Sequence, residues 1–205
     1  MKIRWLAIVG MCTLGALTVS GCQSNIGTAA VVDGSKISES DVNRYVDPAT
    51  AEAGQARNLS LQYQIREKLF TVALDRKNAI PSDQQLQAQH DLAVSNLIGQ
   101  QVSGAQGDKA LRDLMSQNGL KQSFADVLTH AFELELYYAK QTDAQQEQVV
   151  EKDLAGQHIP VSVNPRYGSW DTSKFAFTGL SSRQLPSNVT VGGQLPGDVT
   201  QSNSQ

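Results

Sequence analysis

The 205-residue chain has little of several things that specific functions need. It contains two cysteines and three histidines, which is too few for a zinc-finger array or a disulfide framework. Aromatic residues make up 6% of the chain, so a large stacking platform for bases or sugars is not expected. The formal net charge of −3 offers nucleic acid no general electrostatic attraction. The composition therefore predicts a protein that works without a metal, a cofactor or a nucleic-acid partner.

Long hydrophobic runs are also scarce, and the one that exists lies at the N-terminus. Lys2 and Arg4 precede an apolar run, Trp5–Val19, which glycines and threonines interrupt. A membrane-spanning helix needs about 20 apolar residues, so this run is short for that purpose. A charged start, an apolar middle and a small-residue end are typical of a signal peptide. The run ends in Val19-Ser20-Gly21-Cys22, which resembles the bacterial lipobox.

This resemblance implies that residues 1–21 are removed and that Cys22 carries lipid as the first residue of the mature chain. A thiol is the nucleophile that a thioether to lipid requires, and small residues before it can enter a peptidase in an extended form. Residues 22–28 would then tether the protein to the extracytoplasmic face of the cell membrane. No thiol would be left for a disulfide, a metal or catalysis. An ordinary secretory signal and an uncleaved anchor are the alternatives.

The mature chain reads as mainly α-helical. Ser38 and Ser82 are each followed three residues later by Asp41 or Gln85, a spacing typical of a helix start. Apolar residues recur at three and four residues, as on one face of a helix. We expect a loop at residues 103–107. We also expect a short β segment with an Asp-Gly turn at 28–38, helices at 38–47, 56–78, 82–98, 108–117 and 123–154, and a strand at 161–163.

The last part of the chain has a different composition. From Leu180 to Gln205 there is one charge of each sign and no aromatic residue, among many Ser, Gly, Asn, Gln and Pro. Such a segment cannot bury enough apolar surface to order itself. We therefore predict one domain at residues 29–178 and a disordered tail at 179–205.

Three segments of the domain resemble the N-terminal domain of SurA-like and PrsA-like chaperones. They are "AAVVDGSKISESDVNRYV", "ALRDLMSQNGLKQSFADVLTHAFELELYYAK" and "VSVNPRYGSWD", and together they span residues 29–171. The resemblance implies a multihelical, peptide-binding-like lobe in which a strand near Val31 pairs with one near Val163. It also implies that the lobe binds unfolded, partly folded or nascent secreted polypeptides outside the cytoplasm.

The chain departs from this family in one respect. Members often carry a parvulin-type prolyl isomerase domain between the long helix and the returning segment, and here only residues 141–160 occupy that place. Nothing in those residues resembles the parvulin core. We therefore expect a binding lobe alone and no enzymatic activity.

Candidate catalytic or ligand residues are few. His90 on a glutamine-rich helix reads as solvated or next to a cap, His130 as a partly buried packing residue, and His158 as a loop residue. Glu133 and Glu135 are two residues apart, so they face different sides of a helix and cannot form an acid–base pair.

The candidate peptide contacts are aromatic: Phe132, Tyr137, Tyr138, Tyr167 and Trp170. Adjacent tyrosines cannot face the same way on a helix, so one of Tyr137 and Tyr138 should be exposed. The segment 164–171 reads either as a structural turn whose aromatic rings cover the end of the core, or as the rim of a client groove. Three functions stay open: a lipid-anchored chaperone lobe, a lipoprotein that binds one dedicated partner in envelope assembly, and an enzyme.

Overall fold

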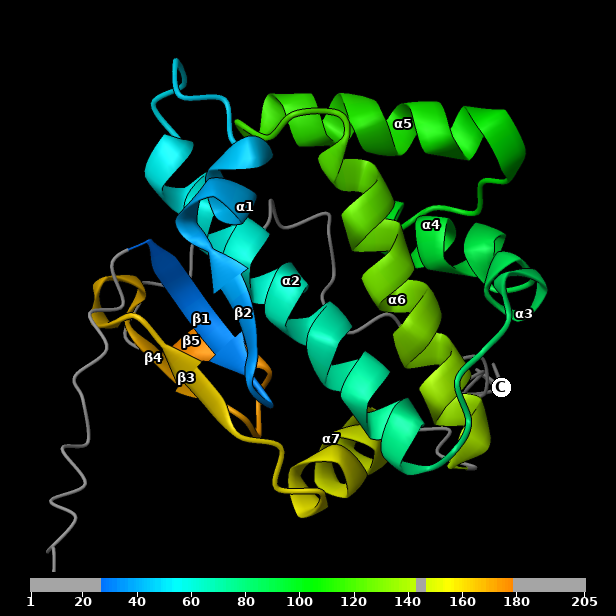
Figure 1. Cartoon of the computed structure of the whole chain (residues 1–205). Coiled ribbons are helices and arrows are strands. Elements are labelled where there is room, and N and C mark those ends of the chain that lie inside the picture. Colours follow the sequence, from blue (N-terminus) through cyan, green and yellow to red (C-terminus); the bar gives the residue numbers. More distant parts are fainter. Residues whose placement is uncertain (1–26, 143–146, 179–205) are drawn as a thin grey trace, which may run out of the picture.

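The structure is a computed structural model, and it describes residues 27–142 and 147–178. The predicted signal peptide, Cys22 and the predicted disordered tail lie outside these residues. The described part is mainly helical, with seven α-helices and small antiparallel sheets (Figure 1). In the described part, no helix combines the length and the apolar character that crossing a membrane requires.

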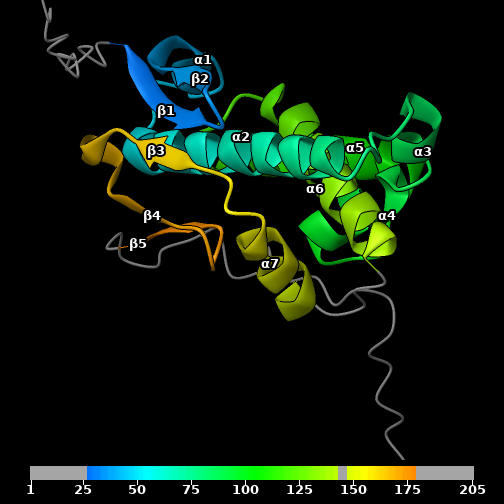
Figure 2. The ribbon, with the colours of Figure 1, turned by 60° about the horizontal axis from the view of Figure 1, so that its bottom comes forward.

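The helices are α1 (Glu39–Arg44), α2 (Ala53–Arg76), α3 (Asp83–Gln87), α4 (His90–Ile98), α5 (Gly104–Gln117), α6 (Phe124–Gln141) and α7 (Glu147–Gly156). The strands are β1 (Thr28–Val32), β2 (Ser35–Ser38), β3 (Val161–Val163), β4 (Ser169–Asp171) and β5 (Ala176–Thr178), with a short 3-10 helix, η1 (Pro165–Tyr167), before β4. Figure 2 shows α2 lengthwise, with β1 and β3 beside its first half and α6 crossing it.

The two ends of the described chain meet in one sheet. Its strand order is β2-β1-β3, and both pairings are antiparallel. Asp33 and Gly34 both have positive φ, 46° and 81°, so the predicted Asp-Gly turn joins β1 to β2. Val31 lies opposite Ser162, and Ala30 lies opposite Val163. The predicted pairing between the strands near Val31 and Val163 is confirmed.

Both predicted capping boxes are present. The Ser38 side chain accepts the Asp41 N–H while the Asp41 carboxylate accepts the Ser38 N–H, and Ser82 and Gln85 do the same for α3. These contacts satisfy N–H groups that a helix start otherwise leaves free. The Ser38 hydroxyl also holds the pKa of Asp41 below its ordinary value.

The single helix expected at 82–98 is two helices. α3 ends at Gln87, and α4 begins at His90, whose ring nitrogens lie 2.8 Å from a Glu133 oxygen and 2.9 Å from an Asp108 oxygen. The prediction of a loop at 103–107 was also wrong, because α5 begins at Gly104. The Asp91 carboxylate accepts the Gly104 N–H at 2.9 Å and so caps α5 from another helix. A distant cap of this kind leaves no local sequence signal.

The long helix expected to continue to Leu154 ends at Gln141, and α7 is separate. The Tyr138 hydroxyl donates to the Asp153 carboxylate and accepts from Gln157 at 2.6 Å. In one continuous helix, Tyr138 and Asp153 would be about 22 Å apart. α7 therefore turns back against α6.

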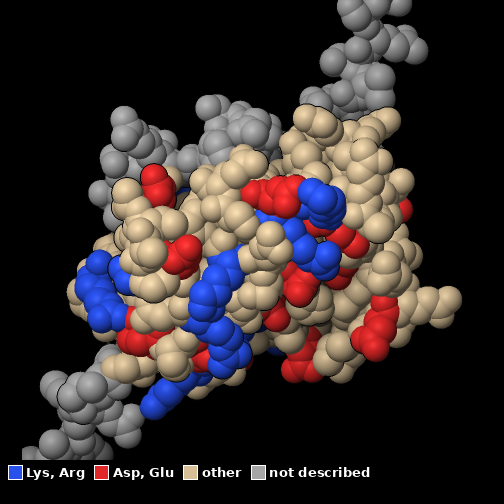
Figure 3. Space-filling view, turned by 90° about the horizontal axis from the view of Figure 1, so that it is seen from above, with Lys and Arg blue, Asp and Glu red and all other residues tan. Residues whose placement is uncertain are grey.

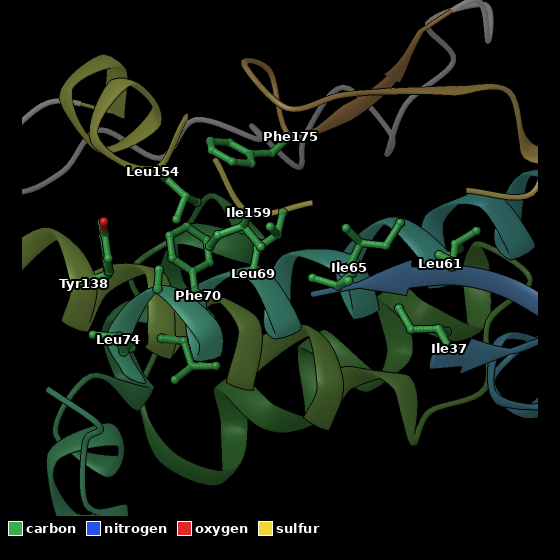
Figure 4. Close-up of a cluster of buried hydrophobic side chains, with 14 of the residues drawn as sticks. Ile37, Leu61, Ile65, Leu69, Phe70, Leu74, Tyr138, Leu154, Ile159 and Phe175 are labelled. Atoms are coloured by element: carbon green, nitrogen blue, oxygen red, sulfur yellow. The ribbon is translucent and has the colours of Figure 1, made fainter. Parts of the chain in front are cut away.

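Buried side chains form two clusters. The sheet-side cluster lies among β1, β2, the middle and end of α2, the end of α6, α7 and the returning segment, with Leu69 and Phe70 in its middle and Tyr138 at one end (Figure 4). The helical-corner cluster lies among α4, α5, the first turns of α2 and most of α6, around Tyr63, Phe124 and Leu128. α2 and α6 contribute to both clusters and so join them.

Candidate functional site

Three of the five aromatic residues predicted to contact a peptide are buried. Phe132, Tyr138 and Tyr167 keep 6%, 0% and 3% of their surface exposed, whereas Tyr137 and Trp170 are half-buried. The adjacent tyrosines face different ways, as expected, but Tyr137 is half-buried and not exposed as predicted. α6 is covered by α2, α4, α5 and α7, so it has no free apolar face on which Phe132 or Tyr138 could meet a client.

Each buried ring of α6 has partners within the molecule. Phe132 stacks on Tyr63 at 6.0 Å between ring centres, and the Arg66 guanidinium lies 5.7 Å from the Phe132 ring. Burial, together with the hydrogen bond to Asp153, raises the pKa of Tyr138. These two residues stabilise the core, which corrects their prediction as surface contacts.

The half-buried aromatic residues belong to the edges of the core. The Tyr137 hydroxyl accepts from the Gln85 side chain at 3.2 Å. The Trp170 ring meets Phe177 edge-on at 5.4 Å, in the hairpin of β4 and β5. The segment 164–171 therefore covers the end of the sheet-side cluster, as the structural-turn reading expected.

The structure contains a groove to which the segment 164–171 contributes Arg166 and Tyr167; the sequence offered this segment as a groove rim but did not indicate the other lining residues. Its volume is about 760 Å³, and we call it the Tyr167 groove. Four segments that are far apart in the sequence form it: the end of α1 with the following loop, the first turns of α2, the loop before α6, and η1. Its lining residues are Asn43, Val46, Pro48, Gly54, Arg57, Asn58, Lys121, Arg166 and Tyr167.

The loop before α6 is held against the end of α1 by backbone contacts. Val46 and Leu120 form an isolated antiparallel bridge, and the Lys121 N–H donates to the Tyr45 carbonyl at 2.7 Å. Gly119 has φ +71°, and a Cβ there would lie 2.6 Å from the Thr50 hydroxyl oxygen. Glycine is required here because the chain turns and another loop approaches closely. This packing places Lys121 at the groove.

The returning segment is fixed to the start of β1. The Asn164 N–H donates to the Ala29 carbonyl at 2.8 Å, and the Asn164 side chain donates to the Thr28 carbonyl at 3.2 Å. The Tyr167 hydroxyl then donates to the Glu39 carboxylate at 2.6 Å. Arg166 pairs with the same carboxylate and lies 5.0 Å from the Tyr167 ring. Tyr167 therefore forms a rigid, buried wall of the groove.

A second cavity, of about 250 Å³, lies in the helical corner beside His90 and His130. A neutral imidazole has one N–H, so it cannot donate to two carboxylates. His90 meets both Asp108 and Glu133, and this geometry favours its doubly protonated form. His90 was expected to be solvated or next to a cap: its ring is bonded to two carboxylates, and it does lie next to Gln89, the N-cap residue of α4.

The pKa values in this cavity follow from that geometry. Burial lowers the pKa of His90, but its hydrogen bonds to Asp108 and Glu133 outweigh burial and raise it. The hydrogen bond to Glu133 likewise raises the pKa of His130. Burial raises the pKa of Glu133, but its bonds to the two histidines lower it below its ordinary value. The set is a network of ion pairs that links α4, α5 and α6.

Glu133 and Glu135 face different partners, as predicted. Glu133 contacts the two histidines, whereas Glu135 pairs with the buried Arg66 of α2 at 2.5 Å. Within residues 27–142 and 147–178, no group of three or more His, Cys, Asp or Glu side chains is arranged to hold a metal ion.

Comparisons with known protein families, with curated proteins and with solved structures find no match for this chain.

Proposed function

We propose that this protein is an extracytoplasmic lipoprotein, anchored through Cys22, whose helical lobe binds extended segments of unfolded or partly folded polypeptide without catalysis. The observation that carries the proposal is the Tyr167 groove, which lies where the returning segment closes onto the start of β1. Ligand pockets in proteins commonly have volumes of about 300–1,000 Å³, so a groove of about 760 Å³ is large enough for part of a chain.

The lining of the groove suits a polypeptide backbone. The amide side chains of Asn43 and Asn58 offer both donors and acceptors, which can pair with peptide N–H and C=O groups of any sequence. Pro48 is exposed and offers apolar contact to client side chains, whereas Val46 and Tyr167 are buried and line the groove with little exposed surface. A mixture of sequence-independent hydrogen bonds and modest apolar burial gives weak, reversible binding.

The pairing of β1 with β3 supports the same proposal. The resemblance to SurA-like and PrsA-like chaperones implied that the two ends of the lobe meet in this way, and Val31 does lie opposite Ser162. Residues 141–160, which are too few to form a parvulin domain, contain α7, and α7 packs on α6.

A specific observation favours the second candidate, a lipoprotein that binds one dedicated partner. In the described part of the chain, the large hydrophobic residues that are exposed are Ile80 and Val149, at 63% and 45%. A general holdase needs apolar surface to bind many clients. A single groove with defined polar groups is compatible with a narrower choice of partner.

The groove can be tested by filling it. Gly54 lines the groove, and a Cβ there meets nothing within 4 Å, so Gly54→Trp should occupy the space without straining α2. Gly156→Trp is the matched control, because Gly156 is also open but ends α7. We expect the full chain to slow the aggregation of chemically reduced insulin, measured by light scattering. The Gly54→Trp variant should lose most of this effect, and the control should keep it.

Three outcomes would change the proposal. Equal activity of Gly54→Trp and the wild type would show that the groove is not the binding site. No suppression of aggregation, together with saturable binding of one co-purified envelope protein, would establish the dedicated-partner alternative. For the anchor, mass spectrometry of the protein from a bacterial membrane should find lipid on Cys22, and an unmodified N-terminus would contradict that part.

A further inference from the structure

We propose that the Tyr167 groove selects polypeptide segments that carry an acidic residue, whose carboxylate is bound by Arg57 and Lys121. The inference rests on the proposed function and adds a preferred class of client to it. Arg57, Lys121 and Arg166 all line the groove, and its lining contains no carboxylate.

Arg57 differs from the other arginines of the described part. Its guanidinium donates to the neutral Asn43 side chain at 2.9 Å and has no carboxylate partner there. The others are each paired with an acidic side chain: Arg44, Arg66, Arg76, Arg112 and Arg166. A guanidinium binds carboxylates through two parallel hydrogen bonds, so Arg57 is available for a charged ligand.

Lys121 is also available. It is exposed, and within residues 27–142 and 147–178 its ammonium group forms no ion pair, while its backbone N–H bonds Tyr45 and its carbonyl accepts the Phe124 N–H. The backbone contacts that hold residues 119–121 fix the position of its Cα, and the side chain remains free to meet a ligand. Because Lys121 and Arg57 line the same groove, each can offer a charge-assisted donor to a carboxylate bound there.

Two acidic residues near the groove, Glu39 and Asp47, already have partners. Glu39 pairs with Arg166 and accepts from Tyr167, which offsets the charge of Arg166 alone. The Asp47 carboxylate accepts the Ala49 N–H of its own turn at 3.0 Å. Glu52, the exposed N-cap residue of α2, lies beside Gly119, and a Cβ at Gly119 would be 3.3 Å from the Glu52 Cβ. Among the described residues, neither Arg57 nor Lys121 forms an ion pair with Glu52 or with any other carboxylate.

The start of α2 adds to this field. α2 has 24 residues and no side chain caps it, but its N-cap residue is Glu52, whose negative charge offsets part of the dipole's attraction for an anion. Gly54 of that turn lines the groove. The free N–H groups and the dipole of a helix start favour a nearby anion. This contribution supports the two side chains and does not replace them.

The shape of the site favours a peptide carboxylate over a membrane surface. The chain as a whole carries a net charge of −3, and Figure 3 shows acidic side chains interspersed with basic ones over one face. A flat anionic membrane would face all of these charges, whereas a single carboxylate within the groove faces mainly those within the Debye length of about 8–10 Å. The groove lining also lacks a large exposed hydrophobic residue that could enter a bilayer.

Two unlabelled peptides of equal length and apolar content, which differ only by Glu or Gln at the central position, provide the test. We expect isothermal titration calorimetry with the full chain to show about tenfold tighter binding of the Glu peptide. The double variant Arg57→Gln/Lys121→Gln should bind both peptides with the affinity that the wild type shows for the Gln peptide. Lys140→Gln is the matched control, because it removes an exposed lysine at the other end of α6, about 25 Å away.

The outcomes separate this inference from the proposed function. If the wild type binds both peptides equally, the preference is wrong and peptide binding stands. If neither peptide binds and reduced insulin still aggregates, the proposed function fails and the inference fails with it. If vesicles of phosphatidylglycerol bind and the double variant abolishes that binding, without any peptide preference, the groove is a lipid site instead. Should the double variant not fold, Lys121→Gln alone should still reduce the preference about threefold.

Discussion

The two hydrophobic clusters of this molecule are assembled over different distances in the chain. In the sheet-side cluster, the Asn164 side chain bonds the Thr28 carbonyl across 136 positions, and Tyr167 bonds Glu39 across 128. In the helical corner, Gly104 bonds Asp91 across 13 positions and His90 meets Asp108 across 18. The sheet side therefore closes the larger loop, and loop closure costs more entropy as the loop lengthens.

The two regions also differ in the interactions that stabilise them. The sheet side depends on backbone pairing of β1 with β2 and β3, and ion pairs such as Arg76–Asp33 and Lys77–Asp153 accompany this pairing. The helical corner combines apolar packing with a network of two histidines and their carboxylate partners. The Tyr167 groove lies where the two regions meet, since η1 belongs to the sheet side and Lys121 lies in the loop before α6, in the helical corner. Substitutions that disturb either region should therefore alter the groove.

The largest expected effect comes from breaking the strand pairing with Ser162→Pro. The backbone N–H groups of Asp33 and Asn164 donate to the carbonyls of Pro160 and Ala29. Val31 and Ser162 lie opposite each other midway between these two pairs, so they too are a hydrogen-bonded pair of the antiparallel ladder. A proline there removes a ladder donor and should lower the free energy of unfolding by about 3 kcal/mol. Urea denaturation followed by tryptophan fluorescence measures it, because Trp170 lies in the adjacent hairpin.

Ser162→Ala is the control for this variant. The Ser162 side chain is exposed, so its truncation should change the stability by less than about 0.5 kcal/mol. If Ser162→Pro were as stable as Ser162→Ala, the pairing of β1 with β3 would not hold the sheet side together.

A smaller effect is expected at the junction, from Gly119→Ala. The positive φ and the close Thr50 hydroxyl both oppose a Cβ, so the variant should lose about 1–2 kcal/mol of stability and displace Lys121. Gly156→Ala, in open space on α7, should be neutral or slightly stabilising. Thermal unfolding compares the two, and a Gly119→Ala protein with an unchanged melting temperature would contradict the packing of this loop.

The smallest effect is a pH dependence in the helical corner. The folded pKa of His90 is raised above its ordinary 6.5, so its contribution is fully present below pH 6.5 and is lost as the pH rises through the raised pKa. Losing one of two charge-assisted bonds costs about 1 kcal/mol, or about 2–4 °C in melting temperature. His90→Gln should therefore flatten the decline of the melting temperature between about pH 6 and about pH 9.

His130 titrates in the same direction, so some decline should remain in this variant. Glu133 has the opposite behaviour: its lowered pKa means that its contribution is lost at acidic pH, as the pH falls through that value. An identical pH profile for His90→Gln and the wild type would show that His90 does not join these helices as an ion pair.

Much of the local structure could be predicted because its causes are local. Ser38 with Asp41 and Ser82 with Gln85 form capping boxes within a single turn, and the Asp33-Gly34 turn depends on residues that tolerate positive φ. The breaks at Ala88–Gln89 and after Gln141 could not be predicted in this way. His90 meets Asp108 and Glu133, and Tyr138 meets Asp153, only after the helices pack.

The candidate site shows the same limit. The sequence reasoning selected aromatic residues on α6 because their spacing was visible, and packing buried Phe132 and Tyr138. It missed Arg57 and Lys121, since each is an ordinary charged residue in its own segment. What distinguishes Arg57 is that no carboxylate reaches it, which is a property of the folded molecule.

Cysteine, histidine and aromatic residues are scarce in this sequence, and that scarcity excluded several classes of site. Helix periodicity and capping residues predicted a mainly helical lobe. The sequence also predicted β1, β2 and β3, because alternation and turn residues act over neighbouring positions, but it did not predict the hairpin of β4 and β5. Only the tertiary structure decided that four distant segments enclose one basic groove. Side chains from separate elements gain a common environment only when apolar burial and strand pairing bring those elements together.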